Sequence, residues 1–251
     1  MKTLEEHLQF ANDCYTFAIR FVWEWQKRHP EMNRSELMRL TLLHYLLRKG
    51  PIEPPPTEPH PLEVEAAELA ERVNSPEEME VLRPKILAQV KEVYPATFAP
   101  QGNYPPGMSL RFDNPHYEFP GRWCYIHIYN ALAPASMLAD QEYMIRNFRY
   151  VMDEGEKEFG YDTLYTFTWL NSNPAWLRYF PQEWQEHLGY PFPGLVGNLS
   201  VLGQFLNAAG DLNHRNAEYL LTHGEPRFKR RASYCSFAAM REHLKKLETE
   251  K

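Results

Sequence analysis

The residues best suited to chemistry lie in the segment WCYIHIYN, residues 123–130. If this segment is a strand, alternate side chains share a face, and His127 lies between Tyr125 and Tyr129. The ordinary pKa of a histidine lies near physiological pH, so its imidazole can both accept and donate a proton. We therefore predict that His127 is the catalytic acid or base. The alternative is a structural histidine that bonds to a backbone carbonyl.

Polar residues are expected to follow the ends of two strands. Asn130 comes after the first strand, and Asn171 ends a second apolar segment, LYTFTWLN. Ser136 is expected at the N-terminus of the helix between them, where unpaired amide groups favour an anion or a carbonyl oxygen. The predicted substrate-binding residues are Tyr125, Tyr129, Asn130, Ser136, Trp169, Asn171, Asn173 and Trp176. Asparagines also cap helices and turn loops, so a purely structural role for them is the alternative.

A strand–helix–strand unit would bring these residues together. Neither strand contains a charged residue, as expected of strands covered on both faces, and residues 136–158 between them have apolar side chains at helical spacing. Such a βαβ unit is expected to be right-handed, with parallel strands whose carboxyl ends form a ligand site. We therefore expect an α/β, helix-rich fold with a small, mainly parallel sheet built on a βαβ unit at about residues 122–173.

The N-terminal region is expected to be a helical hairpin over residues 1–50. Thr3 with Glu6, and Asn33 with Glu36, have the spacing of capping boxes, which start helices. The first helix is apolar around most of its circumference, so it is expected to be buried in its own core or against a second subunit. The hairpin is therefore also a candidate homodimer interface.

A proline-rich linker at residues 51–61 is expected to separate this hairpin from an α/β domain with flanking helices at residues 62–251. The linker contains six prolines, which exclude a regular helix or strand. Two charged helices are expected after it, and Pro84 should kink or split the second one. A third strand or an extended edge is expected near residues 227–237, followed by a C-terminal helix.

Composition narrows the class of protein. The net charge of −6 argues against a nucleic-acid partner, whose binding surface would be basic. The three cysteines, Cys14, Cys124 and Cys235, are widely spaced and odd in number, which suits a reducing compartment. The N-terminus does not resemble a signal peptide, and no apolar run is long enough to cross a membrane. The protein is therefore expected to be soluble and cytoplasmic, with no membrane partner.

Motifs that would fix a reaction are absent from the sequence, among them a Walker loop, GxGxxG, GxSxG, HExxH and CxxC. His116 and Glu118 precede His127 at a spacing that matches no established metal motif, so no metal is assigned and the cofactor stays unknown. Two function classes remain. One is an enzyme acting on a small, partly apolar substrate through His127, with lyase, isomerase and hydrolase not separable. The other is a non-catalytic small-molecule-binding or protein-interaction module that uses the N-terminal helices.

Overall fold

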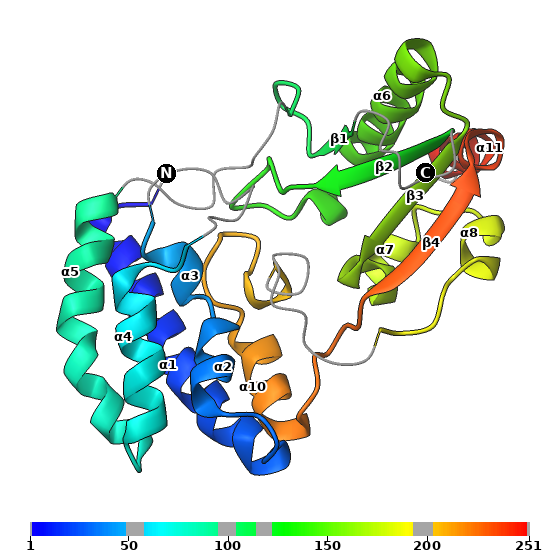
Figure 1. The fold of residues 1–251 in the computed structure, drawn as a ribbon. Helices are drawn as coiled ribbons and strands as arrows, with labels where there is room; N and C mark the ends of the chain where they lie inside the picture. The colour runs from blue at the N-terminus through cyan, green and yellow to red at the C-terminus, as the bar shows by residue number, and fades with distance from the viewer. Residues whose placement is uncertain (1, 49–57, 95–103, 114–121, 193–202, 250–251) are drawn as a thin grey trace. The chain divides into compact units, whose positions relative to one another are not determined.

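The computed structural model describes residues 2–48, 58–94, 104–113, 122–192 and 203–249. These residues belong to two compact units (Figure 1). The first consists of Met1–Gln101, Gly194–Asn207 and Asp211–Arg227, and the second of Gly102–Pro193, Ala208–Gly210 and Phe228–Lys251. Among the described residues, no helix is both long enough and apolar enough to cross a membrane.

The first unit is helical. Its elements are α1 (Leu4–Arg28), α2 (Arg34–Arg39), α3 (Leu43–Leu46), α4 (Pro61–Arg72), η1 (Pro76–Leu82), α5 (Arg83–Val93), η4 (Gly203–Phe205) and α10 (His214–His223). Both predicted capping boxes are present, at Thr3 with Glu6 and at Asn33 with Glu36. The apolar residues of α1 are buried in the core of this unit, against α2, α5 and α10.

Two local predictions need adjustment. The single helix expected after Asn33 is divided into α2 and α3 by Leu40 and Thr41. The kink expected at Pro84 is a change from the 3-10 helix η1 to the α-helix α5 at Arg83, because a proline fits the first turn of an α-helix better than its interior.

The two charged helices beyond the linker pack with the N-terminal helices. Helix α4 contacts α2, and α5 contacts α1, so residues 61–93 belong to the first unit and not to the unit that holds the sheet. Residues 51–57 of the expected linker lie outside the described residues. Part of this packing is apolar: Ala66, Ala67 and Ala70 of α4 are fully buried in the core of the first unit. Small alanine side chains allow this close approach of helices.

The second unit contains a four-stranded sheet in the order β1-β2-β3-β4. The strands are β1 (Leu110–Phe112), β2 (Trp123–Ile128), β3 (Thr163–Thr168) and β4 (Arg231–Ser236). Strands β2 and β3 are parallel, whereas β1 pairs with β2 and β4 with β3 in antiparallel fashion. The sheet is therefore mixed, and the prediction of a mainly parallel sheet was wrong. Each antiparallel pairing joins an edge strand that lies outside the stretch 122–173.

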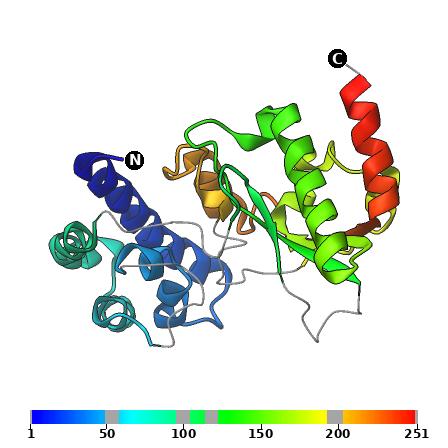
Figure 2. The same cartoon turned by 90° about the horizontal axis from the view of Figure 1, so that it is seen from above.

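The helices of the second unit cover one face of this sheet. They are η2 (Met137–Ala139), α6 (Gln141–Phe159), η3 (Trp169–Ser172), α7 (Pro174–Leu177), α8 (Gln182–Glu186) and α11 (Phe237–Thr249). Cys124, Ile126, Leu164 and Cys235 point from the strands into the core beneath them. Figure 2 shows α6 and α11 side by side on this face. Alternation along the strands turns the side chains between these residues to the opposite face.

Candidate functional site

The opposite face of the sheet carries large aromatic side chains. We call it the aromatic face and define it as Trp123, Tyr125, His127, Tyr165, Phe167 and Tyr234. All six are half-buried, and none belongs to the core of the second unit. The ring centroids of Tyr125 and Tyr165 are 5.5 Å apart, and those of Trp123 and Tyr234 are 5.0 Å apart. Strands β2 and β3 contain no charged residue, and the described helices of this unit pack against the face opposite the aromatic one. A group of aromatic rings that is partly exposed and lies outside the core is typical of a binding surface.

His127 is held in place by a carboxylate. Its Nε2 lies 2.5 Å from Oδ2 of Asp113, and the two side chains are 23% and 20% exposed. The ring of Tyr125 meets the imidazole edge-on, at 4.9 Å between centroids. Within the described part of the chain, Nδ1 of His127 has no hydrogen-bond partner. An imidazole oriented by a carboxylate, with its other nitrogen directed elsewhere, is a common arrangement for proton transfer.

Asp113 is a candidate site residue that the sequence reasoning missed. It follows β1, in which Arg111 pairs with His127 across the antiparallel ladder. Nη1 of Arg111 donates to Oδ1 of Asp113 at 2.5 Å, and the hydroxyl of Tyr161 donates to its backbone carbonyl at 3.1 Å. The strand has three residues within a segment rich in turn-forming residues. Its only sequence signal is the alternation of Leu110 and Phe112 with charged residues.

The surroundings of Asp113 keep its carboxyl group ionised. Burial alone would raise the pKa of Asp113, but hydrogen bonding and charge from His127, and then from Arg111, outweigh burial and lower the pKa below its ordinary value. A depressed carboxyl pKa stabilises the fold above the ordinary value of 3.8, and this contribution is lost as the pH falls through the folded value. The negative charge beside His127 is therefore present at neutral pH.

Replacement of His127 by Gln is expected to raise the pKa of Asp113, because a neutral amide can keep the hydrogen bond to Asp113 but lacks the charge of His127 that lowers this pKa. Titration of the Asp113 carboxyl carbon by ¹³C NMR measures this shift. The matched control is His187→Gln, since His187 stacks on Tyr234 at 3.9 Å and bonds to its backbone carbonyl, away from Asp113. An Asp113 titration that is the same in His127→Gln and wild type would contradict the pairing.

Arg230 lies next to the same tyrosines. Its guanidinium is 4.0 Å from the ring centroid of Phe167, and Nη2 donates to the Phe167 carbonyl at 3.3 Å. Burial lowers the pKa of Arg230, while Tyr125 and Tyr165 act to raise it. Burial raises the pKa of Tyr165, and the charge of Arg230 opposes that change. Tyr125 therefore lies near Arg230 and also contacts His127.

The structure places the predicted aromatic residues in different surroundings. Tyr125 is on the aromatic face beside His127. Tyr129 follows β2, with its ring 5.8 Å from that of Tyr104 and its backbone N–H donating to the Ser109 carbonyl at 2.8 Å. Trp169 lies in η3, packs against the core of the second unit and lies 5.9 Å from the ring of Phe228. Of these three, Tyr125 has direct contact with the imidazole.

Asn130 and Asn173 organise loops. Nδ2 of Asn130 donates to the Ala135 carbonyl at 2.8 Å, and its Oδ1 accepts from the Met137 backbone N–H at 3.2 Å. Oδ1 of Asn173 accepts from the Ala175 backbone N–H at 3.0 Å and caps α7. These bonds favour the structural alternative for both asparagines.

Asn171 is fully buried with Trp176 beneath the sheet. Its Nδ2 donates to the carbonyls of Thr166 and Arg231 at 3.1 and 2.8 Å, and its Oδ1 accepts from Nε1 of Trp176 at 3.0 Å. Trp176 itself packs 4.9 Å from Phe180, among the residues of the core. All of these partners belong to the protein, so Asn171 is a structural link between β3, β4 and α7.

Replacement of Asn171 by Ala is expected to lower the free energy of unfolding by about 1–3 kcal/mol, because it leaves buried partners without hydrogen bonds. Urea denaturation measures the loss. Binding of a ligand to the folded protein should change little in the same variant. A variant that unfolds like wild type but no longer binds ligand would instead show that Asn171 contacts the substrate.

Ser136 does not begin the crossover helix. It is exposed and precedes the three-residue helix η2, without making a side-chain capping bond. Helix α6 begins at Gln141, and the carboxylate of Asp140 accepts from the Tyr143 backbone N–H at 2.9 Å. A carboxylate at this position already compensates the positive end of the helix dipole, which makes the end of α6 unfavourable for a second anion.

The described residues offer no metal-binding cluster, and their cysteines are poorly placed to act as nucleophiles. No group of three or more His, Cys, Asp or Glu side chains there could hold a metal ion, and residues 116 and 118 lie outside the described ranges. Cys14, Cys124 and Cys235 are free and fully buried. Burial raises the pKa of each of these thiols, which opposes formation of a nucleophilic thiolate.

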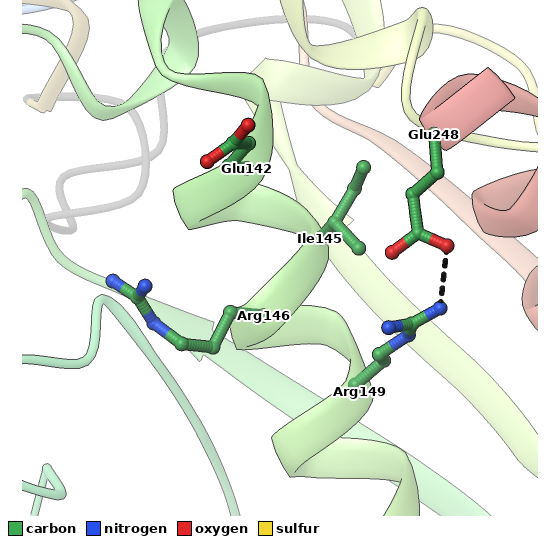
Figure 3. A pocket seen from close by; sticks show the side chains of 5 residues that line it. All are labelled: Glu142, Ile145, Arg146, Arg149 and Glu248. Carbon is green, nitrogen blue, oxygen red and sulfur yellow. Dashed lines mark hydrogen bonds and ion pairs between the residues drawn. The ribbon is translucent and has the colours of Figure 1, made fainter.

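A separate hollow of about 450 Å³ lies between α6 and α11 (Figure 3). It is lined by Glu142, Ile145, Arg146, Arg149 and Glu248. Nη2 of Arg149 donates to Glu248 at 2.7 Å, and Figure 3 shows Arg146 directed away from this pair. Four of the five lining residues are charged, whereas sites for partly apolar small molecules have mainly apolar walls. None of the predicted site residues lines this hollow.

Comparison with known proteins found no matching family, no matching curated protein and no matching solved structure.

Proposed function

We propose that the protein is an enzyme that acts on a small, partly apolar substrate by histidine acid/base chemistry at the aromatic face. The observation that supports this most strongly is the contact of 2.5 Å between Nε2 of His127 and Asp113, on a sheet face whose rings lie outside the core of their unit. His127 is the acid or base, Asp113 orients the imidazole, and Tyr125 contacts the substrate.

The chemistry assigned to each group follows from its surroundings. The carboxylate of Asp113 holds one imidazole nitrogen, so Nδ1 is the atom that would exchange a proton with substrate. The ring of Tyr125 contacts the imidazole, and together with the ring of Tyr165 it offers an apolar surface on this face. Proton transfer to or from a substrate bound there is common to lyases, isomerases and hydrolases.

A thermal-shift screen with small metabolites tests the proposal, followed by mass spectrometry of each stabilising compound after incubation with the full chain. Conversion of a stabilising compound supports an enzyme. Stabilisation without conversion supports instead the second candidate, a non-catalytic binding protein, which the same aromatic face favours. If no compound stabilises the protein and none is converted, both assignments are contradicted.

Three further features belong to the same proposal. The three unpaired cysteines support a reducing, cytoplasmic location.

The parallel pairing of β2 with β3, with α6 between them in the sequence, supports a right-handed βαβ unit. A homodimer through the N-terminal helices remains part of the interaction-module alternative, although the apolar residues of α1 are buried in their own unit. Sedimentation of the purified chain would test the dimer.

A further inference from the structure

Arg230 presents hydrogen-bond donors that lack an acceptor. Its Nε is buried and has no hydrogen-bond partner within the described residues. Nη2 makes one long bond, of 3.3 Å, to the Phe167 carbonyl. Among the described residues, no carboxylate lies within ion-pair distance of this guanidinium. A buried N–H group without an acceptor lowers the stability of the fold. The unpartnered Nε of Arg230 therefore indicates a place for an acceptor from a ligand.

Three other arginines among the described residues also have an unpartnered Nε, but their remaining guanidinium nitrogens have strong acceptors. Arg48 is paired with Glu63, and Arg111 with Asp113. Arg34 donates through Nη1 to the Val73 carbonyl at 2.7 Å and through Nη2 to the Glu71 carbonyl. These three arginines have strong acceptors from the protein itself, whereas Arg230 has one weak acceptor.

The charge on the aromatic face is also unbalanced. At one end, the positive charge of Arg111 is matched by Asp113. At the other end, Arg230 adds a positive charge that no neighbouring carboxylate compensates within the described residues. One further negative charge would complete the balance. The fork of a guanidinium fits the two oxygens of a carboxylate, which would supply an acceptor for Nε.

The walls around Arg230 indicate the shape of the ligand. Phe167 lies beneath the guanidinium, and the rings of Tyr125 and Tyr165 are 5.5 Å apart. Aromatic side chains grouped in this way bind flat, unsaturated rings by stacking or edge contacts. We propose that the aromatic face binds a flat, unsaturated carboxylate, with its carboxylate group on Arg230 and its ring against Tyr125 and Tyr165. This inference rests on the proposed function in placing the reacting part of the ligand near His127.

Benzoate and benzamide test this directly, because they have nearly the same shape and differ in charge. Calorimetric titration of the full chain is carried out with each compound up to about 10 mM, where a ligand with a dissociation constant of about 1 mM is close to saturating. Benzoate is expected to bind at least about tenfold more tightly than benzamide, since hydrogen bonds to charged groups are the stronger ones. Equal binding of the two compounds, or no binding of benzoate, would overturn the inference.

Substitutions of Arg230 locate the bound carboxylate. Arg230→Gln is expected to weaken benzoate binding by about 10- to 100-fold, and Arg230→Lys by less, because lysine keeps the charge but loses the fork. The control is Arg122→Gln, since Arg122 is an exposed arginine that donates to the Gly160 carbonyl at 3.0 Å and pairs with Asp162. Thermal melting shows that each variant is folded. Wild-type affinity in folded Arg230→Gln would overturn the inference.

The variant His127→Gln separates this inference from the proposed function. It should bind benzoate nearly as tightly as wild type, because the carboxylate is held by Arg230. If benzoate binding depends on Arg230 while His127→Gln converts the screened compound at the wild-type rate, the carboxylate site stands and the enzyme proposal fails. If turnover depends on His127 but benzoate binds Arg230→Gln as tightly as wild type, the enzyme proposal stands and the carboxylate site fails.

Discussion

Replacement of His127 by Gln is expected to lower kcat for the compound converted in the screen by about 10²- to 10⁴-fold, the range that general acid/base catalysis contributes. Glutamine can keep a hydrogen bond to Asp113 but cannot take up and release a proton near neutral pH. KM should change much less, because Tyr125 and Tyr165 keep their positions. Initial rates across a range of substrate concentrations separate the two parameters.

His187→Gln is the matched control for this experiment. His187 also lies against the aromatic face, stacked on Tyr234, but its Nδ1 bonds to a backbone carbonyl. The control should retain nearly the wild-type kcat. A wild-type kcat in His127→Gln, or equal losses in the two variants, would show that His127 is structural.

Replacement of Glu63 by Ala is expected to lower the free energy of unfolding by about 3 kcal/mol, because it removes one partner of a buried ionic network. Glu63 in α4 is 4% exposed. It accepts from Nδ1 of His44 and Nη2 of Arg48, both at 2.9 Å, and from the backbone N–H of His60 at 2.8 Å. Urea denaturation measures the change. The control is Glu68→Ala, since Glu68 is exposed on the same helix. Its replacement should lower the free energy of unfolding by less than about 0.5 kcal/mol.

The same network predicts a dependence of stability on pH. Burial alone would raise the pKa of Glu63, but hydrogen bonds from His44, Arg48 and the His60 N–H lower it to about 2. A depressed carboxyl pKa stabilises the fold above the ordinary value of 4.5, and the contribution is lost as the pH falls from there through about 2. The difference in stability between wild type and Glu63→Ala should therefore shrink over this window. A difference that is constant down to pH 2 would contradict the assignment.

Features encoded by neighbouring residues were predictable from the sequence. Thr3 with Glu6 and Asn33 with Glu36 form the expected capping boxes, because such a box involves residues only three positions apart. The apolar segments around Cys124 and Leu164 form β2 and β3, and both residues point into the core.

Features that depend on distant partners were not predictable. The direction of an edge strand depends on where the chain returns to the sheet, which is why β1 and β4 made the sheet mixed. Asp113 was missed because its partner His127 is 14 positions away and the strand that positions it has three residues. The hydrogen bond of Asn171 to the Arg231 carbonyl joins residues 60 positions apart, and a local sequence pattern gives no sign of it.

A structure of the full chain bound to the compound converted in the screen tests the central claim most directly. We expect a ligand stacked on Tyr125 and Tyr165, with a polar atom within about 3.2 Å of Nδ1 of His127, the reach of a proton-transferring hydrogen bond. A ligand seated in the hollow beside Arg146, or on the aromatic face with no atom near His127, would contradict it.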